Sequence, residues 1–346
     1  MTGRWAARDD SRLRVLSQLA WLALAGCGSS PMAKPPIDGG RPARDWEQYP
    51  AVVSLTGTSE IDVLGDVHGD PSVTESVLEA AGLIAPAAGA TPPFAWTGGS
   101  KVLVVTGDVI DKGQDAISII DLLLALEPQA AAAGGKLVVT LGNHEAEFVA
   151  DPTEKKTLQF QQELSQRGYD PVAVAAGQTR YGAWLLTRPV AALVDGWFFC
   201  HAGNSQGMSA TQIAAAYQAD FADTGEPQFN DDFLIGSHSL LEDEQWWVGG
   251  AASTSIQNLD FDLTDLPADH IVFGHDPGEI DFTDDPAGDR APGQMVSRYG
   301  GRIFLIDVGM SYAVGYSKGS LLRIVRGTPD MTTQVLIDGT TEPLGP

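Results

Sequence analysis

Three stretches of sequence decide the fold, and they read IDVLGDVHGD at residues 61–70, VLVVTGDVIDKG at residues 102–113 and LVVTLGNHE at residues 137–145. Each begins with an apolar run and ends in a cluster of glycine and polar residues. The stretches WFFCHAG (197–203) and HIVFGHD (270–276) repeat this arrangement. A short apolar run of this kind predicts a buried strand, and glycine lets the chain turn sharply after it. We therefore expect strands that each end in chemically useful side chains.

Helical stretches separate these strands, which predicts an α/β fold. We expect strands at residues 52–55, 61–64, 102–106, 137–140, 197–200, 270–273 and 303–306, and helices at residues 73–81, 114–126, 154–166 and 210–221. Segments 84–100, 223–232 and 281–294 are rich in Pro, Gly, Ala or Asp and are expected to be exposed loops. The acidic region at about 225–269 is interpreted as an insert within one domain of residues 50–346.

The polar residues at the strand ends suit a metal centre. They are Asp66, His68, Asp108, Asp111, Asn143, His144, His201 and His275. The carboxyl ends of strands in an α/β sheet collect ligands, so these side chains are expected to meet at one rim. Carboxylates, imidazoles and an amide oxygen suit divalent ions such as Mn²⁺, Fe²⁺ or Zn²⁺. No cysteines occur in a paired spacing, which excludes a structural zinc finger. The set is large enough for two ions if one carboxylate bridges them.

The charge of the chain excludes one class of partner. Its 346 residues include 21 basic and 45 acidic residues, for a formal net charge of −24. A duplex nucleic acid needs a basic face, so we expect no nucleic-acid partner. An anionic substrate has to be attracted locally, by metal ions or by a few placed cations.

The N-terminus is typical of an exported bacterial lipoprotein. Residues 1–26 combine early arginines with a short apolar stretch, VLSQLAWLALAG, which ends at Cys27 and is too short to span a membrane. The residues LAGC (24–27) resemble a lipobox, which implies cleavage before Cys27 and acylation of its thiol. Residues 27–49 are rich in Ser, Pro and Gly and are interpreted as a flexible tether. We expect a lipid-anchored protein of the bacterial cell envelope, on the periplasmic face or the outer membrane.

The five motifs together resemble those of the calcineurin-like metallophosphoesterases. GDVHG (65–69), GDVIDKG (107–113), GNHE (142–145), HAG (201–203) and GH (274–275) occur in the family's order. The second and third motifs are similar to those of the phosphoprotein-phosphatase branch, and IDVGMS (306–311) resembles the bacterial Shewanella-like phosphatases. The resemblance implies a four-layer α/β/β/α sandwich with the site at the sheet edges.

The resemblance also implies a role for each motif residue. Two divalent ions, Mn²⁺ and/or iron with Zn²⁺ as an alternative, would share a bridging hydroxide as the nucleophile. The implied metal ligands are Asp66 and His68 for one ion, Asp108 as the bridge, and Asn143, His201 and His275 for the other.

Asp111 and His144 would form a dyad in which His144 protonates the leaving group. The implied phosphate-binding residues are Lys112, Asn143 and Arg298. Lys112 stands where the family has an arginine, so the charge is kept and the bidentate geometry is lost. The family's second arginine has no counterpart, because residues 202–274 contain no Lys or Arg; Arg298 and Lys318 are the candidate substitutes.

Three functions follow from these observations. The leading one is metal-dependent hydrolysis of phosphate monoesters, with a Ser/Thr phosphoprotein or a small phosphate ester as substrate. The second is hydrolysis of nucleotides or dinucleoside polyphosphates. The third, from another class, is an inactive surface-binding lipoprotein whose site still holds metal.

Overall fold

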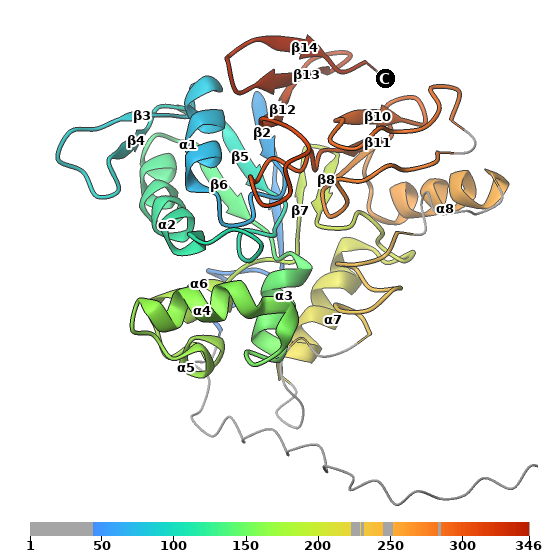
Figure 1. Cartoon of the computed structure of the whole chain (residues 1–346). Coiled ribbons are helices and arrows are strands. Elements are labelled where there is room, and N and C mark those ends of the chain that lie inside the picture. Colours follow the sequence, from blue (N-terminus) through green and yellow to red (C-terminus); the bar gives the residue numbers. More distant parts are fainter. Residues whose placement is uncertain (1–43, 223–228, 230–231, 245–251, 283–284, 346) are drawn as a thin grey trace, which may run out of the picture. The chain divides into compact units, whose positions relative to one another are not determined.

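The computed structural model describes residues 44–222, 229, 232–244, 252–282 and 285–345 (Figure 1). Its strands form two six-stranded sheets and a small hairpin. The first sheet has the order β14 (Thr341–Pro343), β13 (Met331–Leu336), β12 (Ser320–Val325), β2 (Glu60–Leu64), β5 (Val102–Val105) and β6 (Lys136–Val139). The second has the order β1 (Val52–Leu55), β7 (Ala191–Val194), β8 (Trp197–Cys200), β9 (His270–Phe273), β11 (Ile303–Leu305) and β10 (Val296–Arg298).

Parallel strands in each sheet bring the motifs together. β2, β5 and β6 run parallel in the first sheet, and β8 and β9 run parallel in the second. All four residues of β5, Val-Leu-Val-Val, are buried, as expected for a parallel strand covered on both faces. The five strands end at the predicted polar clusters, so these clusters gather where the two sheets present their carboxyl ends (Figure 1).

Helices cover both sheets. α1 (Pro71–Ala80) and α2 (Ala116–Ala132) lie on the side of the first sheet, where α1 contacts β13 and α2 contacts β6. α7 (Ala210–Ala222) contacts β1 of the second sheet, and α8 (Ala252–Asp265) lies on the same side (Figure 1). This arrangement confirms the expected four-layer sandwich. Among the described residues, no helix combines the length and apolar character that crossing a membrane requires.

A group of shorter helices follows β6. It consists of α3 (Asn143–Ala150), η1 (Lys155–Thr157), α4 (Leu158–Gln166), α5 (Pro171–Ala175) and α6 (Arg180–Leu185). The helix predicted at 154–166 corresponds to η1 and α4, whereas α3 was not predicted. α3 begins inside the GNHE motif, so it carries Asn143 and His144 on its first turn.

Two segments that were expected to be exposed loops contain paired strands or buried side chains. Segment 84–100 contains the antiparallel hairpin of β3 (Ile84–Pro86) and β4 (Phe94–Trp96), in which Ile84 and Trp96 are buried. Segment 281–294 holds Arg290, whose side chain is fully buried and hydrogen-bonded to backbone carbonyl groups. Composition favoured loops in both places, but pairing with distant residues overrides it. Residues 223–228, 230–231 and 283–284 of these predicted loops lie outside the described residues.

The last residues of the tether predicted at 27–49 pack against the folded domain. Arg44 donates hydrogen bonds to the carbonyl oxygens of Leu186 (3.1 Å) and Arg188 (3.0 Å), and its guanidinium lies 4.5 Å from the Trp46 ring centroid. Residues 44–49 are therefore attached to the folded domain by buried contacts, which corrects the predicted boundary at residue 49. The predicted signal peptide, Cys27 and the tether up to residue 43 lie outside the described residues.

Candidate metal centre

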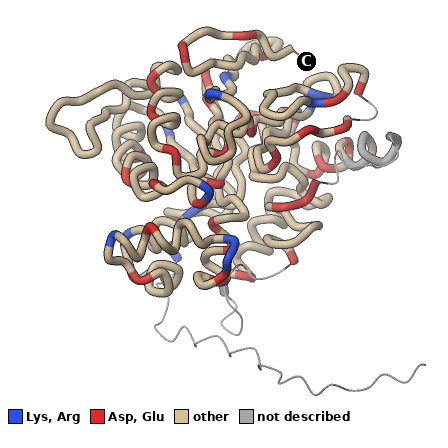
Figure 2. The backbone as a smooth tube through the Cα atoms, in the orientation of Figure 1, with Lys and Arg blue, Asp and Glu red and all other residues tan. Residues whose placement is uncertain are grey.

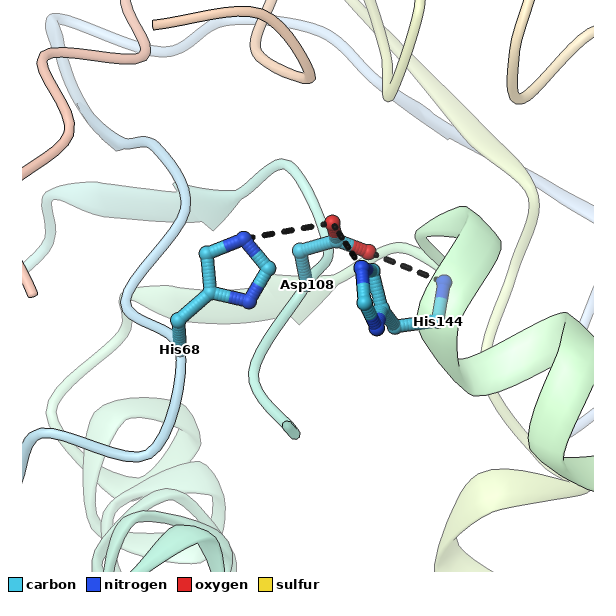
Figure 3. Close-up of side chains that lie close together, drawn as sticks. All are labelled: His68, Asp108 and His144. Carbon is cyan, nitrogen blue, oxygen red and sulfur yellow. Dashed lines mark hydrogen bonds and ion pairs between the residues drawn. The ribbon is translucent and has the colours of Figure 1, made fainter. Parts of the chain in front are cut away.

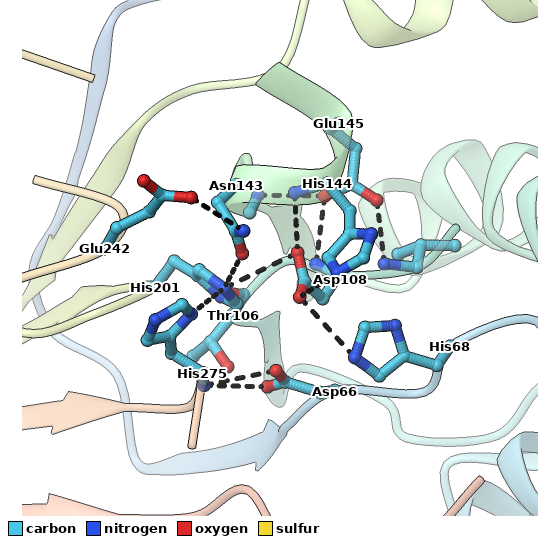
Figure 4. Close-up of polar contacts among 12 residues, drawn as sticks. Asp66, His68, Thr106, Asp108, Asn143, His144, Glu145, His201, Glu242 and His275 are labelled. Atoms are coloured by element: carbon cyan, nitrogen blue, oxygen red, sulfur yellow. Dashed lines mark hydrogen bonds and ion pairs between the residues drawn. The ribbon is translucent and has the colours of Figure 1, made fainter. Parts of the chain in front are cut away.

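The polar residues predicted at the strand ends converge on one place (Figure 4). Asp66 and His68 follow β2, Asp108 follows β5, and Asn143 opens α3 after β6. His201 follows β8 and His275 follows β9, so both sheets contribute. All are buried except His275, which is partly exposed. Two groups of residues could each hold a metal ion, namely His68, Asp108 and His144, and Asp66, Asp108 and His201. Within each group, the possible ligand atoms lie within 4.8 Å of one another.

The backbone around these residues is unusual. Five predicted site residues adopt positive φ angles, namely His68 (39°), Asp108 (51°), Asp111 (61°), Lys112 (55°) and His275 (74°). Such conformations cost non-glycine residues on the order of 1–3 kcal/mol and persist where packing enforces them. Gly107 shows how tight the turn is, because a Cβ atom there would lie 2.4 Å from the backbone nitrogen of Gly142. Such a concentration of positive φ angles is typical of functional sites.

Asp108 occupies the middle of the cluster. Its Oδ1 lies 3.4 Å from Nε2 of His201, and its Oδ2 lies 3.5 Å from Nε2 of His68. Oδ1 also accepts a hydrogen bond from the backbone N–H of His144 at 3.1 Å. The two carboxylate oxygens therefore point toward different imidazoles, which is the geometry that a bridging ligand requires.

Backbone carbonyl groups set the tautomers of two imidazoles. Nδ1 of His68 lies 3.0 Å from the carbonyl oxygen of Ile110, and Nδ1 of His201 lies 2.8 Å from that of Thr106. A carbonyl oxygen can only accept, so each ring carries its proton on Nδ1. In the neutral form of either ring, Nε2 is therefore the atom whose lone pair would bind a metal ion, as in many protein metal sites.

The electrostatics of the cluster favour a bound cation. Burial lowers the pKa of His68 and of His275 to about 3, so both rings are neutral, the form that binds metal. Burial also works to lower the pKa of His201, but the charges of Asp108 and Asp66 outweigh it and raise that pKa to about 10. For Asp66, burial and the nearby charge of Asp307 raise the pKa well above its usual value. The donor set and this negative field together fit divalent cations.

Asp111 and His144 form the predicted pair. Nδ1 of His144 lies 3.3 Å from Oδ2 of Asp111, whose Oδ1 accepts a hydrogen bond from the backbone N–H of Phe160 at 3.0 Å. Nε2 of His144 points back toward Asp108 at 3.9 Å (Figure 3). Burial opposes protonation of His144, but the charge of Asp108 and the hydrogen bond with Asp111 raise its pKa. Asp111 thus orients the ring and stabilises its protonated form.

The two predicted phosphate-binding cations have different surroundings. Nζ of Lys112 lies 3.0 Å from Nε2 of His68, at the edge of the cluster. The Arg298 guanidinium instead donates to the carbonyl oxygens of Gly288 (3.1 Å) and Ser297 (2.9 Å) and lies over the Phe282 ring. The structure brings Lys112 to the site and places Arg298 in a separate packing role, so the geometry does not favour Arg298 as the substitute arginine.

Glu145 is a site residue for which sequence reasoning assigned no role, although it belongs to the GNHE motif. Its carboxylate accepts backbone hydrogen bonds from Asp108 (2.9 Å), Val109 (2.8 Å), Ile110 (3.0 Å) and Gly142 (2.9 Å). One buried side chain therefore holds the loop of the second motif against the start of α3. The position three residues after the helix N-cap was the available signal.

Acidic residues from the predicted insert also reach the cluster. Oε1 of Glu242 accepts a hydrogen bond from Nδ2 of Asn143 at 3.1 Å, and Oε1 of Glu244 lies 3.7 Å from Nε2 of His275. Figure 2 shows how sparse basic residues are along the described chain. No local sequence signal identified Glu242 or Glu244, because their partners are distant in sequence. Part of the predicted insert therefore touches the site.

Two further charged residues support the same region from the second sheet. Asp307, which follows β11, is buried, and burial raises its pKa to about 6. The Arg290 guanidinium donates to the carbonyl oxygens of Asp307, Asp276 and Gly278. It therefore ties the loop after β9, which carries His275, to the loop after β11.

Comparison with known proteins places these features in a family. The family profile described as "Calcineurin-like phosphoesterase" matches residues 59–279. An uncharacterized protein of Schizosaccharomyces pombe is 27% identical over 310 residues, which is 84% of this chain and 82% of the relative. Shewanella-like protein phosphatase 1 of Plasmodium berghei is 23% identical over 292 residues, which is 79% of this chain and 73% of the relative.

A solved structure has the same fold. The crystal structure of a cold-active protein-tyrosine phosphatase from a psychrophilic Shewanella species matches with a TM-score of 0.64 at 21% sequence identity. The match covers 84% of this chain and 82% of that structure.

Proposed function

Because the chain belongs to the calcineurin-like phosphoesterases and is a hydrolase of that kind, we propose that it hydrolyses phosphate monoesters at a centre of two divalent metal ions. The central position of Asp108 carries this proposal. Its carboxylate belongs to both groups of possible ligand atoms, so one side chain can serve two ions. When bound, such a pair of ions lowers the pKa of a water molecule and stabilises charge on phosphoryl oxygens.

The ligands that the family's motifs imply differ in one respect from the two groups of neighbouring residues in the structure. The motifs assign Asp66 and His68 to the same ion, whereas in the structure Asp66 is grouped with His201, and His68 with His144. We retain Asp66, His68, Asp108, Asn143, His201 and His275 as the proposed ligands, because the family's motifs give His144 the role of the acid, and its contact with Asp111 fits that role. His144 is then proposed as the acid that gives its Nε2 proton to the leaving oxygen, while Asp111 stabilises the ring before transfer.

Phosphorylated proteins are the proposed substrate class. One relative is named a protein phosphatase and the solved structure a protein-tyrosine phosphatase. Glu242 and Glu244 beside the proposed ligands support a monoester over a polyphosphate, because extra phosphate groups would meet like charge. Phosphoserine and phosphothreonine are the first candidates, and a dinucleoside polyphosphate is the alternative.

One panel of measurements tests these proposals. The full-length chain purified with Mn²⁺ should contain about two ions per chain by elemental analysis. It should release phosphate from Ser/Thr phosphopeptides and from 4-nitrophenyl phosphate faster than from diadenosine tetraphosphate. A single ion under saturating conditions contradicts the bridging role of Asp108. Two bound ions without turnover of any substrate would instead favour the inactive binding protein.

We also propose that the chain is exported and lipid-anchored through Cys27 in a bacterial cell envelope. The support is the sequence LAGC at residues 24–27 together with the preceding apolar stretch. Several acyl chains anchor a protein stably, at about 0.8 kcal/mol per buried CH₂.

A further inference from the structure

We infer that Glu242 is a positioning residue that fixes the orientation of the Asn143 side chain. The inference rests on the proposed metal function, because it concerns which end of the Asn143 amide faces the metal centre. Only Oδ1 of an asparagine can bind a cation, whereas its NH₂ group repels one. An Asn ligand therefore needs an acceptor that holds Nδ2 on the opposite side.

Glu242 supplies that acceptor. Nδ2 of Asn143 donates to Oε1 of Glu242 at 3.1 Å, while Oδ1 of Asn143 faces Nε2 of His201 at 3.0 Å (Figure 4). An ionised carboxylate accepts and cannot donate, so it distinguishes the two ends of the amide. With the amide turned over, two oxygens would face each other across this contact. Glu242 therefore selects the orientation in which Oδ1 is directed to the centre.

The Glu242 carboxylate is itself held from two sides. Its Oε2 accepts a hydrogen bond from the backbone N–H of Gly236 at 2.7 Å, and its Oε1 accepts one from Nζ of Lys156 at 2.9 Å. Gly236 lies in the same segment as Glu242, whereas Lys156 lies in η1. The carboxylate thus links the described part of the acidic insert to the helices after β6 and cannot swing away freely from Asn143.

Glu147 is a weaker partner of the same amide. It lies one turn along α3, and its Oε1 is 3.4 Å from Nδ2 of Asn143 and is also bonded to Lys156. Its Oε2 has no hydrogen-bond partner among the described residues. The shorter contact with Nδ2 and the hydrogen bond from the backbone of Gly236 make Glu242 the dominant acceptor. Partners of this kind, outside the ligand shell, typically change metal affinity by about 10–100-fold when they are removed.

Metal titration of the full-length chain tests the inference. Mn²⁺ binding is measured by isothermal titration calorimetry for the wild type, Glu242→Ala and Glu242→Gln. Glu242→Ala should weaken the binding of one of the two ions by about 10–100-fold and leave the binding of the other nearly unchanged. Glu242→Gln should restore much of the affinity, because its side-chain oxygen can still accept from Asn143.

A matched pair of lysine variants serves as the control. Lys156→Met removes a cation that holds Glu242 and should weaken the binding of the same ion by a smaller factor. The neighbouring exposed Lys155→Met should bind Mn²⁺ like the wild type. Wild-type affinity for both ions in Glu242→Ala overturns the inference while leaving the metal function intact. A wild type that binds fewer than two ions overturns the metal function, and the inference with it.

A measurement on the metal-free chain gives a second, independent readout. The side-chain NH₂ resonances of Asn143, identified by their loss in Asn143→Ala, should shift in Glu242→Ala because a charged acceptor is removed. They should move little in Lys155→Met. Unchanged resonances in Glu242→Ala would also overturn the inference.

Discussion

Glu145→Gln should destabilise the fold and weaken metal binding together, because one buried carboxylate organises the loop that carries Asp108. Oε2 of Glu145 accepts from Asp108 and Gly142, and Oε1 accepts from Val109 and Ile110. Glutamine keeps one oxygen and places an NH₂ group at the other. Two backbone N–H groups then lose their acceptor and face a donor, in a place that water does not reach.

The size of the effect follows from the number of lost bonds. A hydrogen bond to a charged group contributes about 1.5–3 kcal/mol, so two lost bonds should cost about 3–6 kcal/mol of unfolding free energy. Burial and the charge of Asp108 raise the pKa of Glu145, so the native state already bears a cost for this carboxylate. We therefore expect the loss of unfolding free energy to lie near the lower end of this range. A typical domain has about 5–15 kcal/mol of stability, so the variant should still fold.

Glu163→Gln is a matched control within the same chain. Its carboxylate accepts from the backbone N–H groups of Ala116 and Ile117, both at 2.9 Å, at the start of α2. Each oxygen accepts one backbone bond, and Oε1 also lies 3.3 Å from Nε of the exposed Arg167. Glutamine should therefore lose one backbone bond and about half as much stability. Glu163 contacts none of the proposed metal ligands through these bonds, so Mn²⁺ affinity should be unchanged.

Urea unfolding of the metal-free variants, followed by circular dichroism, measures the stability loss, and calorimetry measures Mn²⁺ affinity. The reasoning is refuted if Glu145→Gln loses no more stability than Glu163→Gln. It is also refuted if Glu145→Gln binds both ions as tightly as the wild type, since Asp108 would then need no support from Glu145.

Substitutions at three further residues test individual roles. His144→Asn should keep both metal ions and slow turnover by about 10²–10⁴-fold, more for alkyl phosphates than for 4-nitrophenyl phosphate, whose leaving group needs no proton; equal slowing, or loss of metal, would contradict the acid role. Lys112→Ala should lower kcat/KM on the order of 10-fold by removing a cation near the bound phosphate, whereas Lys112→Arg should retain or improve it; unchanged kinetics in Lys112→Ala would mean that Lys112 is only a solvated loop residue. Cys27→Ser should abolish acylation and move the protein from the detergent phase to the aqueous phase on partitioning, and identical partitioning of both proteins in the aqueous phase would exclude the anchor.

Local sequence was sufficient to predict several strands and the family. Residues 52–55, 197–200 and 270–273 were predicted as strands and are β1, β8 and β9 with the same bounds. The apolar run of a buried strand and the glycine after it lie next to each other in the chain, so both are visible without the fold. The convergence of the motifs could be predicted for the same reason, because parallel strands end at a common edge.

Only the tertiary structure decided what surrounds these motifs. Asn143 and Glu242 are 99 positions apart, and the hydrogen bond between them depends on how the insert packs over α3. Arg290 and Arg298 lie eight positions apart, yet Arg290 is fully buried between the loops that follow β9 and β11, while Arg298 packs on Phe282. Hydrophobic period and turn chemistry describe neighbours along the chain. Side chains that orient a ligand or satisfy a buried carbonyl group act across space, so their partners are determined by packing rather than by local pattern.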